Sequence, residues 1–398
     1  MALKTIVLTC APILNEAQTQ GFMQIIQDFE KRQCRIVYYG NVHNTAFYSY
    51  ANQKLSHHKI FYKFSLYWVL WQIDRDKWLS RLKSHHPPAD NVVIGFKVLK
   101  TIIRAAVKYF CSVKPDLFIC WNPHSPTFGI WADTAQLMGI PVAAVEWGLL
   151  PETFILDKDG TLAASRIFNR SVLYNSPERF FTIGEKVYND LQKQSISLYP
   201  QATEALPDSF THTDDSQVRI LLIGIDMVDS GSLPENHNDH FGLLPFHRSC
   251  THQALDIAAA DANFKVIYKP HPSHNFDKQS GELASNCWMS NSNPDQLIKW
   301  ADVIVCSGSK MEFSALLAGK PLVNIGAGIL YKKGCSYEVD EPAQLKHTIM
   351  QARQHGVTLE QIQAFKQFLG FLLDDYLYVY GDVKDNTVII DRIVQHCK

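Results

Sequence analysis

Two stretches of the sequence decide the fold: VIYKPHP at Val266–Pro272, and ADVIVCSGSKMEFSALLAGKPLVNIG at Ala301–Gly326. Each begins as a short apolar run, typical of a buried strand, and changes to polar residues where the strand would end. Open parallel sheets bind ligands at the carboxyl ends of their strands. The two stretches therefore predict one binding edge, whose lysine, histidine and serines indicate an anion such as a nucleotide phosphate.

The first stretch places a lysine and a histidine on either side of Pro270. If strand geometry continues through this proline, Lys269 and His271 point the same way. A lysine charge beside an imidazole donor suits a phosphate that gains charge as it leaves. The alternative is a turn in which Pro272 ends the strand and His271 is solvated, since short motifs also occur by chance.

The second stretch places Ser307, Gly308 and Ser309 before a predicted helix. Ser309 can cap that helix, with Glu312 three residues later as in a capping box. Free backbone N–H groups at such an end favour an anion. Capping alone also explains the pattern, and the two interpretations are compatible.

Composition indicates an ordinary globular enzyme-sized chain. With 398 residues, 46% of them hydrophobic and 19% charged, the chain is expected to form two domains. A net charge of −1 argues against a general nucleic-acid binder. Nine dispersed cysteines without a C-x-x-C pair fit a reducing cytosol. No run of eighteen apolar residues occurs, so a cytoplasmic protein is expected, with peripheral attachment at the inner membrane left open.

Strands alternate with helices along the chain, which predicts parallel sheets covered on both faces. We expect a first Rossmann-like domain at 1–197, a Pro- and Ser-rich linker at 198–217 and a second such domain at 218–365. The helices of 366–398 are expected to pack back on the first domain.

An unusually aromatic segment lies between His57 and His85. As a helix it would carry apolar residues around nearly its whole circumference, with basic residues towards both ends. One interpretation is a buried helix of the first domain. The other is a surface for a membrane or a lipid-linked acceptor.

Carboxylates follow one apolar strand in each predicted domain. Glu146 follows VAAV in the first, and Asp226 and Asp229 follow RILLIGI in the second. One carboxylate from each domain across a cleft is an arrangement that supports glycosyl transfer through an oxocarbenium-like transition state. Each acid taken singly also fits a loop cap or a solvated charge.

Three further polar residues lie at strand ends of the first domain: Asn15, Asn122 and His124. They are candidate contacts to an acceptor. A histidine- and aspartate-containing loop at 237–247 matches no standard metal spacing, so no metal site is predicted.

These motifs resemble the GT-B glycosyltransferases, whose two Rossmann-like domains face a central cleft. The segment ADVIVCSGS…FSALLAGKPLVNIG is similar to their donor domain, and the HP dipeptide with downstream serines resembles members that use CMP- and CDP-linked donors. VEWGLLPETFILDKDGTLAASR at Val145–Arg166 and ILLIGIDMVDSGSL at Ile220–Leu233 resemble segments of capsule-type β-Kdo transferases. Asp226 stands where that family usually has Gln, Ser230 where it has a second Asp, and Trp147 where it has an acid.

The resemblance implies transfer of β-Kdo from CMP-Kdo to an oligosaccharide or lipid-linked glycan of the bacterial surface, such as a capsule, lipopolysaccharide or O antigen, with retained configuration. Asp229 would be the nucleophile, with Asp226 its rival, and Glu146 the acid/base. The groups that would hold CMP are Lys269, His271, Pro272, Ser307, Gly308, Ser309 and Glu312. No cofactor and no metal is implied, because fixed donors can stabilise the leaving phosphate.

Three alternatives stay open at this point. The first is an inverting sialyltransferase that uses CMP-sialic acid, and the second is a nucleotide-sugar epimerase. The third is a catalytically silent glycan-binding module of a larger multidomain enzyme.

Overall fold

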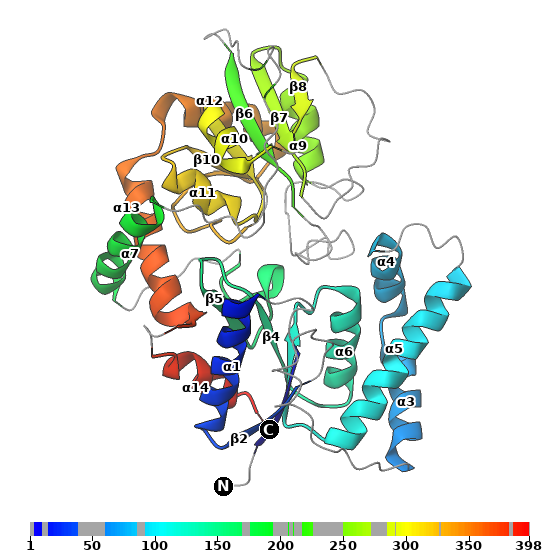
Figure 1. Ribbon diagram of the computed structural model, residues 1–398. Coiled ribbons are helices and arrows are strands. Elements are labelled where there is room, and N and C mark those ends of the chain that lie inside the picture. Colours follow the sequence, from blue (N-terminus) through cyan, green and yellow to red (C-terminus); the bar gives the residue numbers. More distant parts are fainter. Residues whose placement is uncertain are drawn as a thin grey trace. The chain divides into compact units, whose positions relative to one another are not determined.

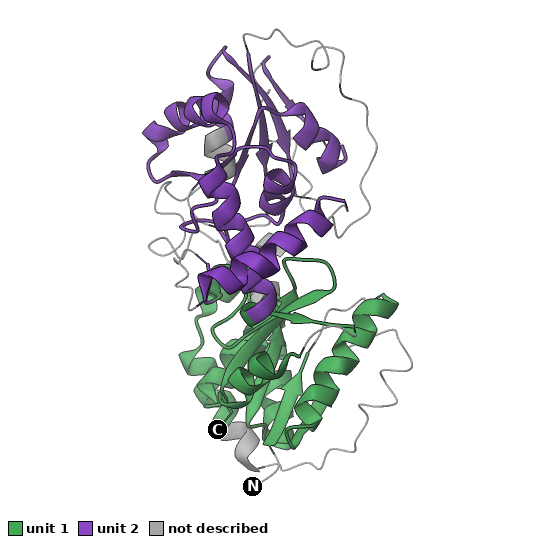
Figure 2. Ribbon diagram, turned by 90° about the vertical axis from the view of Figure 1, so that its left-hand side faces the viewer, with its two compact units in different colours: residues 1–165, 375–398 green, residues 166–374 purple. Residues whose placement is uncertain are grey.

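The computed structural model describes most of the chain and divides it into two compact units (Figure 2). Unit 1 comprises residues 1–165 and 375–398, and unit 2 comprises residues 166–374. The described residues are 4–9, 15–38, 60–85, 92–168, 176–193, 206, 210, 217–225, 250–271, 285–290, 292–325, 328–381 and 385–397.

Unit 1 is built on a six-stranded sheet in the order β12-β5-β4-β3-β1-β2 (Figure 1). The four strands from β4 to β2 are parallel, whereas β5 is antiparallel to both β4 and β12. The strands are β1 (Lys4–Leu8), β2 (Cys34–Tyr38), β3 (Leu117–Trp121), β4 (Val142–Trp147), β5 (Thr153–Asp157) and β12 (Leu377–Val379). The chain moves outward from β1 to β2 and then crosses to β3 on the other side, so the strand order reverses between β1 and β3.

Helices cover both faces of this sheet. One face packs on α1 (Glu16–Glu30) and α14 (Thr387–Val394), which bury Phe22, Phe29 and Ile390. The other face packs on α5 (Val92–Val113) and α6 (Pro126–Leu137), which bury Phe110 and Trp131. Two more helices, α3 (Ile60–Gln72) and α4 (Arg75–His85), pack on α5 and α6 through a separate cluster. A short 3-10 helix, η1 (Leu162–Ala164), follows β5.

Unit 2 contains a second six-stranded sheet, entirely parallel, in the order β11-β10-β9-β6-β7-β8 (Figure 1). The strands are β6 (Val218–Ile223), β7 (Phe264–Lys269), β8 (Cys287–Met289), β9 (Val303–Cys306), β10 (Leu322–Ile325) and β11 (Tyr337–Val339). Near-continuous apolar runs form the central strands because both of their faces are covered. Here the strand order reverses between β6 and β9.

The helices of unit 2 lie around this sheet. Its core cluster includes residues of α9 and α12, while α10 and α11 contact β6, β9 and β10. The helices are α7 (Pro177–Leu191), α9 (Cys250–Ala259), α10 (Pro294–Trp300), α11 (Met311–Leu317), α12 (Leu345–His355) and α13 (Leu359–Phe371), with the 3-10 turn η3 (Pro342–Gln344) and the π-turn η4 (Leu372–Tyr376).

Helices α7 and α13 make an unusually close contact. A Cβ added at Gly184 would lie 1.6 Å from the carbonyl oxygen of Lys366, and one added at Gly370 would lie 1.8 Å from that of Phe180. The two glycines therefore allow the helix backbones to touch. Arg179 pairs with Asp374 at 2.8 Å beside this contact.

The predicted α/β class with two Rossmann-like domains is confirmed, and so is the return of the C-terminal helix to the first sheet. The bounds of the units differ from the expected domains. Residues 166–193, expected in the first domain, belong to unit 2 because α7 buries its apolar face on α13, and the return begins at Asp375 rather than at 366. Most of the expected linker at 198–217 lies outside the described residues, and the expected cleft between the domains stays a prediction.

Candidate functional site

The carboxyl edge of the unit 2 sheet carries most of the predicted ligand-binding residues. Lys269 ends β7, and Ser307 follows β9, with β6 between these two strands. The reversal of strand order beside β6 is the place where open α/β sheets bind ligands. The structure thus brings the two stretches that opened the sequence argument to one edge of one sheet.

The ends of β6 and β7 are packed tightly together. The amide of Gly224, just after β6, donates to the carbonyl oxygen of Lys269 at 2.8 Å. A Cβ at Gly224 would lie 2.7 Å from the hydroxyl of Tyr268 and 3.3 Å from the backbone nitrogen of His271. A side chain at this position would therefore displace the Tyr268 hydroxyl, and His271 is held close to the end of β6.

Lys269 is 7% exposed, whereas His271 is half-buried. Buried lysines in folded proteins have interaction partners, and Lys269 also interacts with other groups of the chain. The strand ends at Lys269, so strand alternation does not extend to His271, and the expectation that both side chains point the same way is not supported by that argument. Pro272 lies outside the described residues.

The serine turn after β9 has a different structure from the one predicted. Helix α11 begins after Lys310, which is its N-cap and makes no side-chain cap. The hydroxyl of Ser309 accepts from the amide of Met311 at 3.3 Å, while Gly308 donates its amide to Oε1 of Glu312 at 2.6 Å. The predicted capping box is wrong, because the carboxylate reaches back one residue further, to Gly308 rather than Ser309.

This turn also uses several amides that were expected to be free for an anion. The amide of Glu312 donates to the carbonyl oxygen of Ser309 at 3.0 Å, and that of Phe313 donates to Lys310 at 3.1 Å. Gly308 adopts φ 78°, which favours glycine. The helix end is therefore largely satisfied within the chain. Lys269 and His271 are the predicted cationic and donor residues of the edge, and both also interact within the chain.

Glu312 lies at the centre of a buried polar cluster below this edge. Its side chain is 0% exposed, and burial raises its pKa to about 7, against the opposing effect of hydrogen bonds from the amides of Gly308 and Leu330. Lys333, 7% exposed, donates to the carbonyl oxygens of Ile167 at 2.8 Å and Tyr331 at 3.1 Å. Burial lowers the pKa of Lys333 to about 8.

Asn324 on β10 belongs to the same region. It is 0% exposed and pairs in register with Cys306 on β9, whose thiol contacts Glu312. Within the described part of the chain, neither the side-chain carboxamide of Asn324 nor Oε2 of Glu312 has a hydrogen-bond partner. Buried polar groups of this kind are normally satisfied by water, an ion or a ligand. Neither Asn324 nor Lys333 is among the site residues predicted from the sequence.

The carboxyl edge of the unit 1 sheet holds the predicted acceptor-side residues. Asn122, just after β3, has φ 29°, and its Oδ1 accepts from the amide of His124 at 3.0 Å. The ring Nε2 of His124 lies 2.8 Å from the carbonyl oxygen of Thr161, to which it donates. A non-glycine residue at positive φ is strained, and such strain concentrates at functional sites.

A buried arginine completes this edge and was not predicted. Arg81 on α4 is 2% exposed, donates to the carbonyl oxygen of His124 at 3.0 Å and lies over the ring of Trp78 at 5.1 Å. In the sequence Arg81 is one of the basic residues towards the end of the aromatic segment, so nothing marks it as buried. Glu146, near the end of β4, is 8% exposed, and its Oε1 accepts from the amide of Trp147 at 3.1 Å.

The remaining predicted residues are not part of these two edges. Asn15 is the N-cap of α1 and forms a capping box with Gln18, which explains it without a ligand. Asp226 and Asp229 lie outside the described residues, so their pairing with Glu146 stays a prediction. Among the residues that are described, no three His, Cys, Asp or Glu side chains form a cluster that could hold a metal ion.

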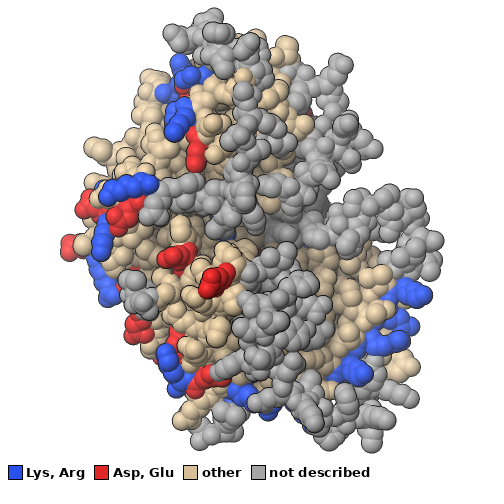
Figure 3. All heavy atoms as spheres, viewed as in Figure 1, with Lys and Arg blue, Asp and Glu red and all other residues tan. Residues whose placement is uncertain are grey.

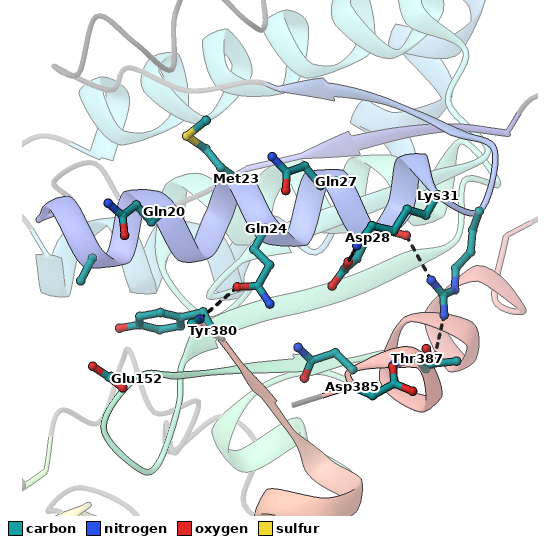
Figure 4. A pocket seen from close by; sticks show the side chains of 14 residues that line it. Gln20, Met23, Gln24, Gln27, Asp28, Lys31, Glu152, Tyr380, Asp385 and Thr387 are labelled. Atoms are coloured by element: carbon teal, nitrogen blue, oxygen red, sulfur yellow. Dashed lines mark hydrogen bonds and ion pairs between the residues drawn. The ribbon is translucent and has the colours of Figure 1, made fainter. Parts of the chain in front are cut away.

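A groove of about 700 Å³ lies elsewhere in unit 1, between α1 and the residues Tyr380, Gly381 and 385–387 (Figure 4). Its lining is mostly polar. The amide of Gly381 donates to Oε1 of Gln24 at 3.0 Å, and the Tyr378 hydroxyl donates to Asp28 at 2.7 Å. The groove contains none of the predicted site residues, so its size gives no reason to move the candidate site there.

Two Rossmann-like sheets in one chain, with the last helix returned to the first sheet, fit the two-domain GT-B fold. No protein-family model matches the chain, and no curated protein matches it.

Solved structures with a similar course of the chain include two from Thermosulfurimonas dismutans KpsC. One is its β-Kdo 2,4 transferase, at a TM-score of 0.43 and 18% identity over 63% of this chain and 78% of that chain. The other is its β-Kdo 2,7 transferase, at a TM-score of 0.42 and 14% identity over 91% of this chain and 89% of that chain. The glycosyltransferase SnogD from Streptomyces nogalater matches at a TM-score of 0.31 and 13% identity over 99% of both chains. At these values the similarities carry no information on donor or mechanism.

Proposed function

We propose that the chain is a glycosyltransferase that moves β-Kdo from CMP-Kdo to a glycan acceptor of the bacterial surface. One observation carries the proposal: Lys269 at the end of β7 is buried and lies with His271 at the carboxyl edge of the unit 2 sheet, next to β6, beyond which the strand order reverses towards β9 and Ser307. That edge is where a parallel sheet binds a nucleotide. The choice of CMP-Kdo rests on the sequence resemblance.

In this proposal Lys269 and His271 hold the phosphate of CMP, and the region of Ser307 and Ser309 accommodates the nucleotide. The lysine charge opposes the negative charge that grows on the phosphate as its bond to the sugar breaks. Because this stabilisation comes from fixed protein groups, the proposed reaction needs no metal ion.

The proposed reaction consists of two displacements at the anomeric carbon. In the first, a carboxylate of Asp229, or of its rival Asp226, forms a bond to that carbon as CMP leaves. In the second, an acceptor hydroxyl displaces the carboxylate and gives its proton to Glu146. Two inversions leave the sugar in its original β configuration.

The donor test measures nucleotide release from CMP-Kdo, CMP-sialic acid and UDP-sugars separately, each with and without short glycans. We expect release from CMP-Kdo that depends on the glycan, with a β-configured product by NMR. An inverted product from CMP-sialic acid would indicate the sialyltransferase alternative. Turnover that does not depend on a glycan would indicate the epimerase alternative. Stimulation by UDP-sugars only would refute the donor assignment.

The site test compares two lysines on the same strand. Lys269→Met removes the charge at the carboxyl edge, whereas Lys265→Met removes one near the start of β7, where the ammonium lies 5.0 Å from the centre of the Phe210 ring. A charge-assisted bond to phosphate contributes about 2 to 3 kcal/mol, so kcat/KM for the donor should fall about 30- to 160-fold in Lys269→Met. A similar loss in both variants, with both folded, would contradict the assigned edge.

A further inference from the structure

Helix α3 exposes a cluster of aromatic side chains. Tyr67 is 73% exposed, Trp71 72% and Trp68 45%, and the rings of the two tryptophans meet edge to face with their centres 5.8 Å apart. Residues 64–73 contain no charged side chain. Contiguous exposed aromatics of this size mark an interaction surface rather than an ordinary solvated face.

These aromatics are not displaced core residues, because α3 also has a well-packed inner face. Leu66, Val69 and Ile73 on that face are at most 8% exposed and pack in one cluster with Leu99 and Ile103 of α5. The sequence interpretation of a wholly buried helix is therefore incomplete. The segment forms two helices, of which α3 buries one side and presents aromatics on the other.

Helix α5, on which α3 packs, carries a basic stripe. Lys97, Lys100, Arg104 and Lys108 are all exposed and follow the spacing i, i+3, i+7, i+11, which places them along one side of a helix. Figure 3 shows Lys and Arg side chains gathered over α5, at the lower right. The whole of α5 contains no acidic residue.

Residues at the start of α5 add exposed apolar groups to the aromatics of α3 and the basic stripe of α5. Phe96 and Val98 are 37% and 41% exposed, and the guanidinium of Arg75 lies over the Phe96 ring at 5.7 Å. Arg75 begins α4, so exposed aromatic, aliphatic and cationic groups belong to one layer made of α3, α5 and the start of α4. We call this layer, defined by Tyr67, Trp68, Trp71 and the four basic residues of α5, the aromatic–basic layer.

We propose that the aromatic–basic layer binds the surface of a bilayer that contains anionic lipid. Tryptophan and tyrosine favour the headgroup region, where an apolar ring and a polar N–H or O–H are both accommodated. Lysine and arginine beside them are attracted to anionic headgroups. The charge complementarity of a stripe with four cations and no anion selects this partner over an uncharged apolar one.

The contact is peripheral in this proposal. No helix among the described residues is long and apolar enough to cross a bilayer. Aromatic insertion and electrostatic attraction would act together, as in two-signal membrane attachment.

The test is co-sedimentation of the full chain with vesicles of phosphatidylcholine alone, or with about a third phosphatidylglycerol. We expect binding to the anionic vesicles only, and a clear loss of binding as salt rises to about 1 M, where screening acts over about 3 Å. Equal binding to both vesicles, or to neither, would overturn the proposal. The readout does not involve sugar transfer, so it is independent of the proposed function.

Two double variants test the layer itself. Lys100→Gln with Arg104→Gln should weaken binding about 25-fold, because each cation near an anionic surface contributes about fivefold. The charge control is Lys186→Gln with Lys193→Gln, two exposed lysines at α7, which should leave binding within about twofold. Equal losses in the two pairs would contradict the assignment of the surface.

The aromatic pair is Tyr67→Ser with Trp71→Ser, and we expect at least a tenfold loss from the apolar area removed. Its control is Leu359→Ser with Val388→Ser, residues 74% and 56% exposed on other helices. Sedimentation velocity without lipid gives the competing result: a wild-type dimer that dissociates in the aromatic pair would assign the surface to a second copy of the chain and overturn the proposal.

Discussion

Substitution of Glu312 by Gln should remove a specific dependence of stability on pH. The carboxyl is 0% exposed, and burial raises its pKa from 4.5 to about 7. Gln keeps an oxygen that can accept from the amide of Gly308, now bonded at 2.6 Å, but it cannot ionise. The substitution therefore separates the cost of the buried charge from the loss of the hydrogen bond.

The sign follows from the direction of the shift. Because the pKa of folded Glu312 lies above the unfolded value, folding favours the protonated form, and this contribution to stability is full below pH 4.5 and is lost as pH rises through about 7. A shift of 2.5 pKa units, from 4.5 to about 7, corresponds to about 3 kcal/mol. From about pH 4.5 to about pH 8, the free energy of unfolding should thus fall by about 3 kcal/mol more in the wild type than in Glu312→Gln.

The assay is urea unfolding of the full chain at several pH values. Pulse-labelling hydrogen exchange, read on peptides from β9 and α11, reports unit 2 separately from unit 1. Glu178→Gln is the control, because Glu178 is an exposed carboxyl of the same unit, in the first turn of α7. Parallel pH profiles of wild type and Glu312→Gln, within about 0.5 kcal/mol, would refute the argument that burial controls this carboxyl.

Two further substitutions test the packing that supports the sites. Trp78→Ala should lower the free energy of unfolding by about 3 to 5 kcal/mol. Trp78 is fully buried, and its Nε1 donates to Asp133 at 2.7 Å. A loss under about 1 kcal/mol in chemical denaturation would contradict this prediction. Gly184→Ala should disrupt the contact of α7 with α13, because the added Cβ would lie 1.6 Å from the carbonyl oxygen of Lys366. Unchanged protection of both helices from amide hydrogen exchange would contradict this prediction.

The sheets could be predicted because their signal is local. Stretches such as ILLI in β6 and VIVC in β9 are apolar throughout, which is typical of strands covered on both faces. The polar residues that follow β7 and β9 then fall at one edge once the strands are parallel. Lys269 and Ser307 could therefore be placed from the sequence before any coordinates.

The details of the polar cluster could not be predicted in the same way. The spacing of Ser309 and Glu312 matches a capping box, but the helix begins one residue later and the carboxylate bonds to Gly308. Asn324 did leave a signal, as a polar residue inside the apolar run of β10. Lys333 left none, because its burial depends on Ile167, which lies far away in the sequence.

The boundary between the units depends on contacts that no local pattern encodes. The periodicity of α7 shows an apolar face, with Phe180, Tyr188 and Leu191, that needs a partner. It does not say whether that partner is the preceding sheet or α13, which follows much later in the chain. The structure selects α13, since Gly184 and Gly370 allow the two backbones to touch.

Unit 2 interrupts unit 1 in the chain, and this has a consequence for biosynthesis. Residues 166–374 leave the ribosome before 375–398, so β12 and α14 reach unit 1 only after all of unit 2 has been made. Until then one edge of β5 lacks its neighbour β12, and the sheet face that α14 covers lacks Ile389, Ile390 and Ile393. An unpaired strand beside uncovered apolar surface invites aggregation. The nascent chain is most in need of chaperone protection during this interval.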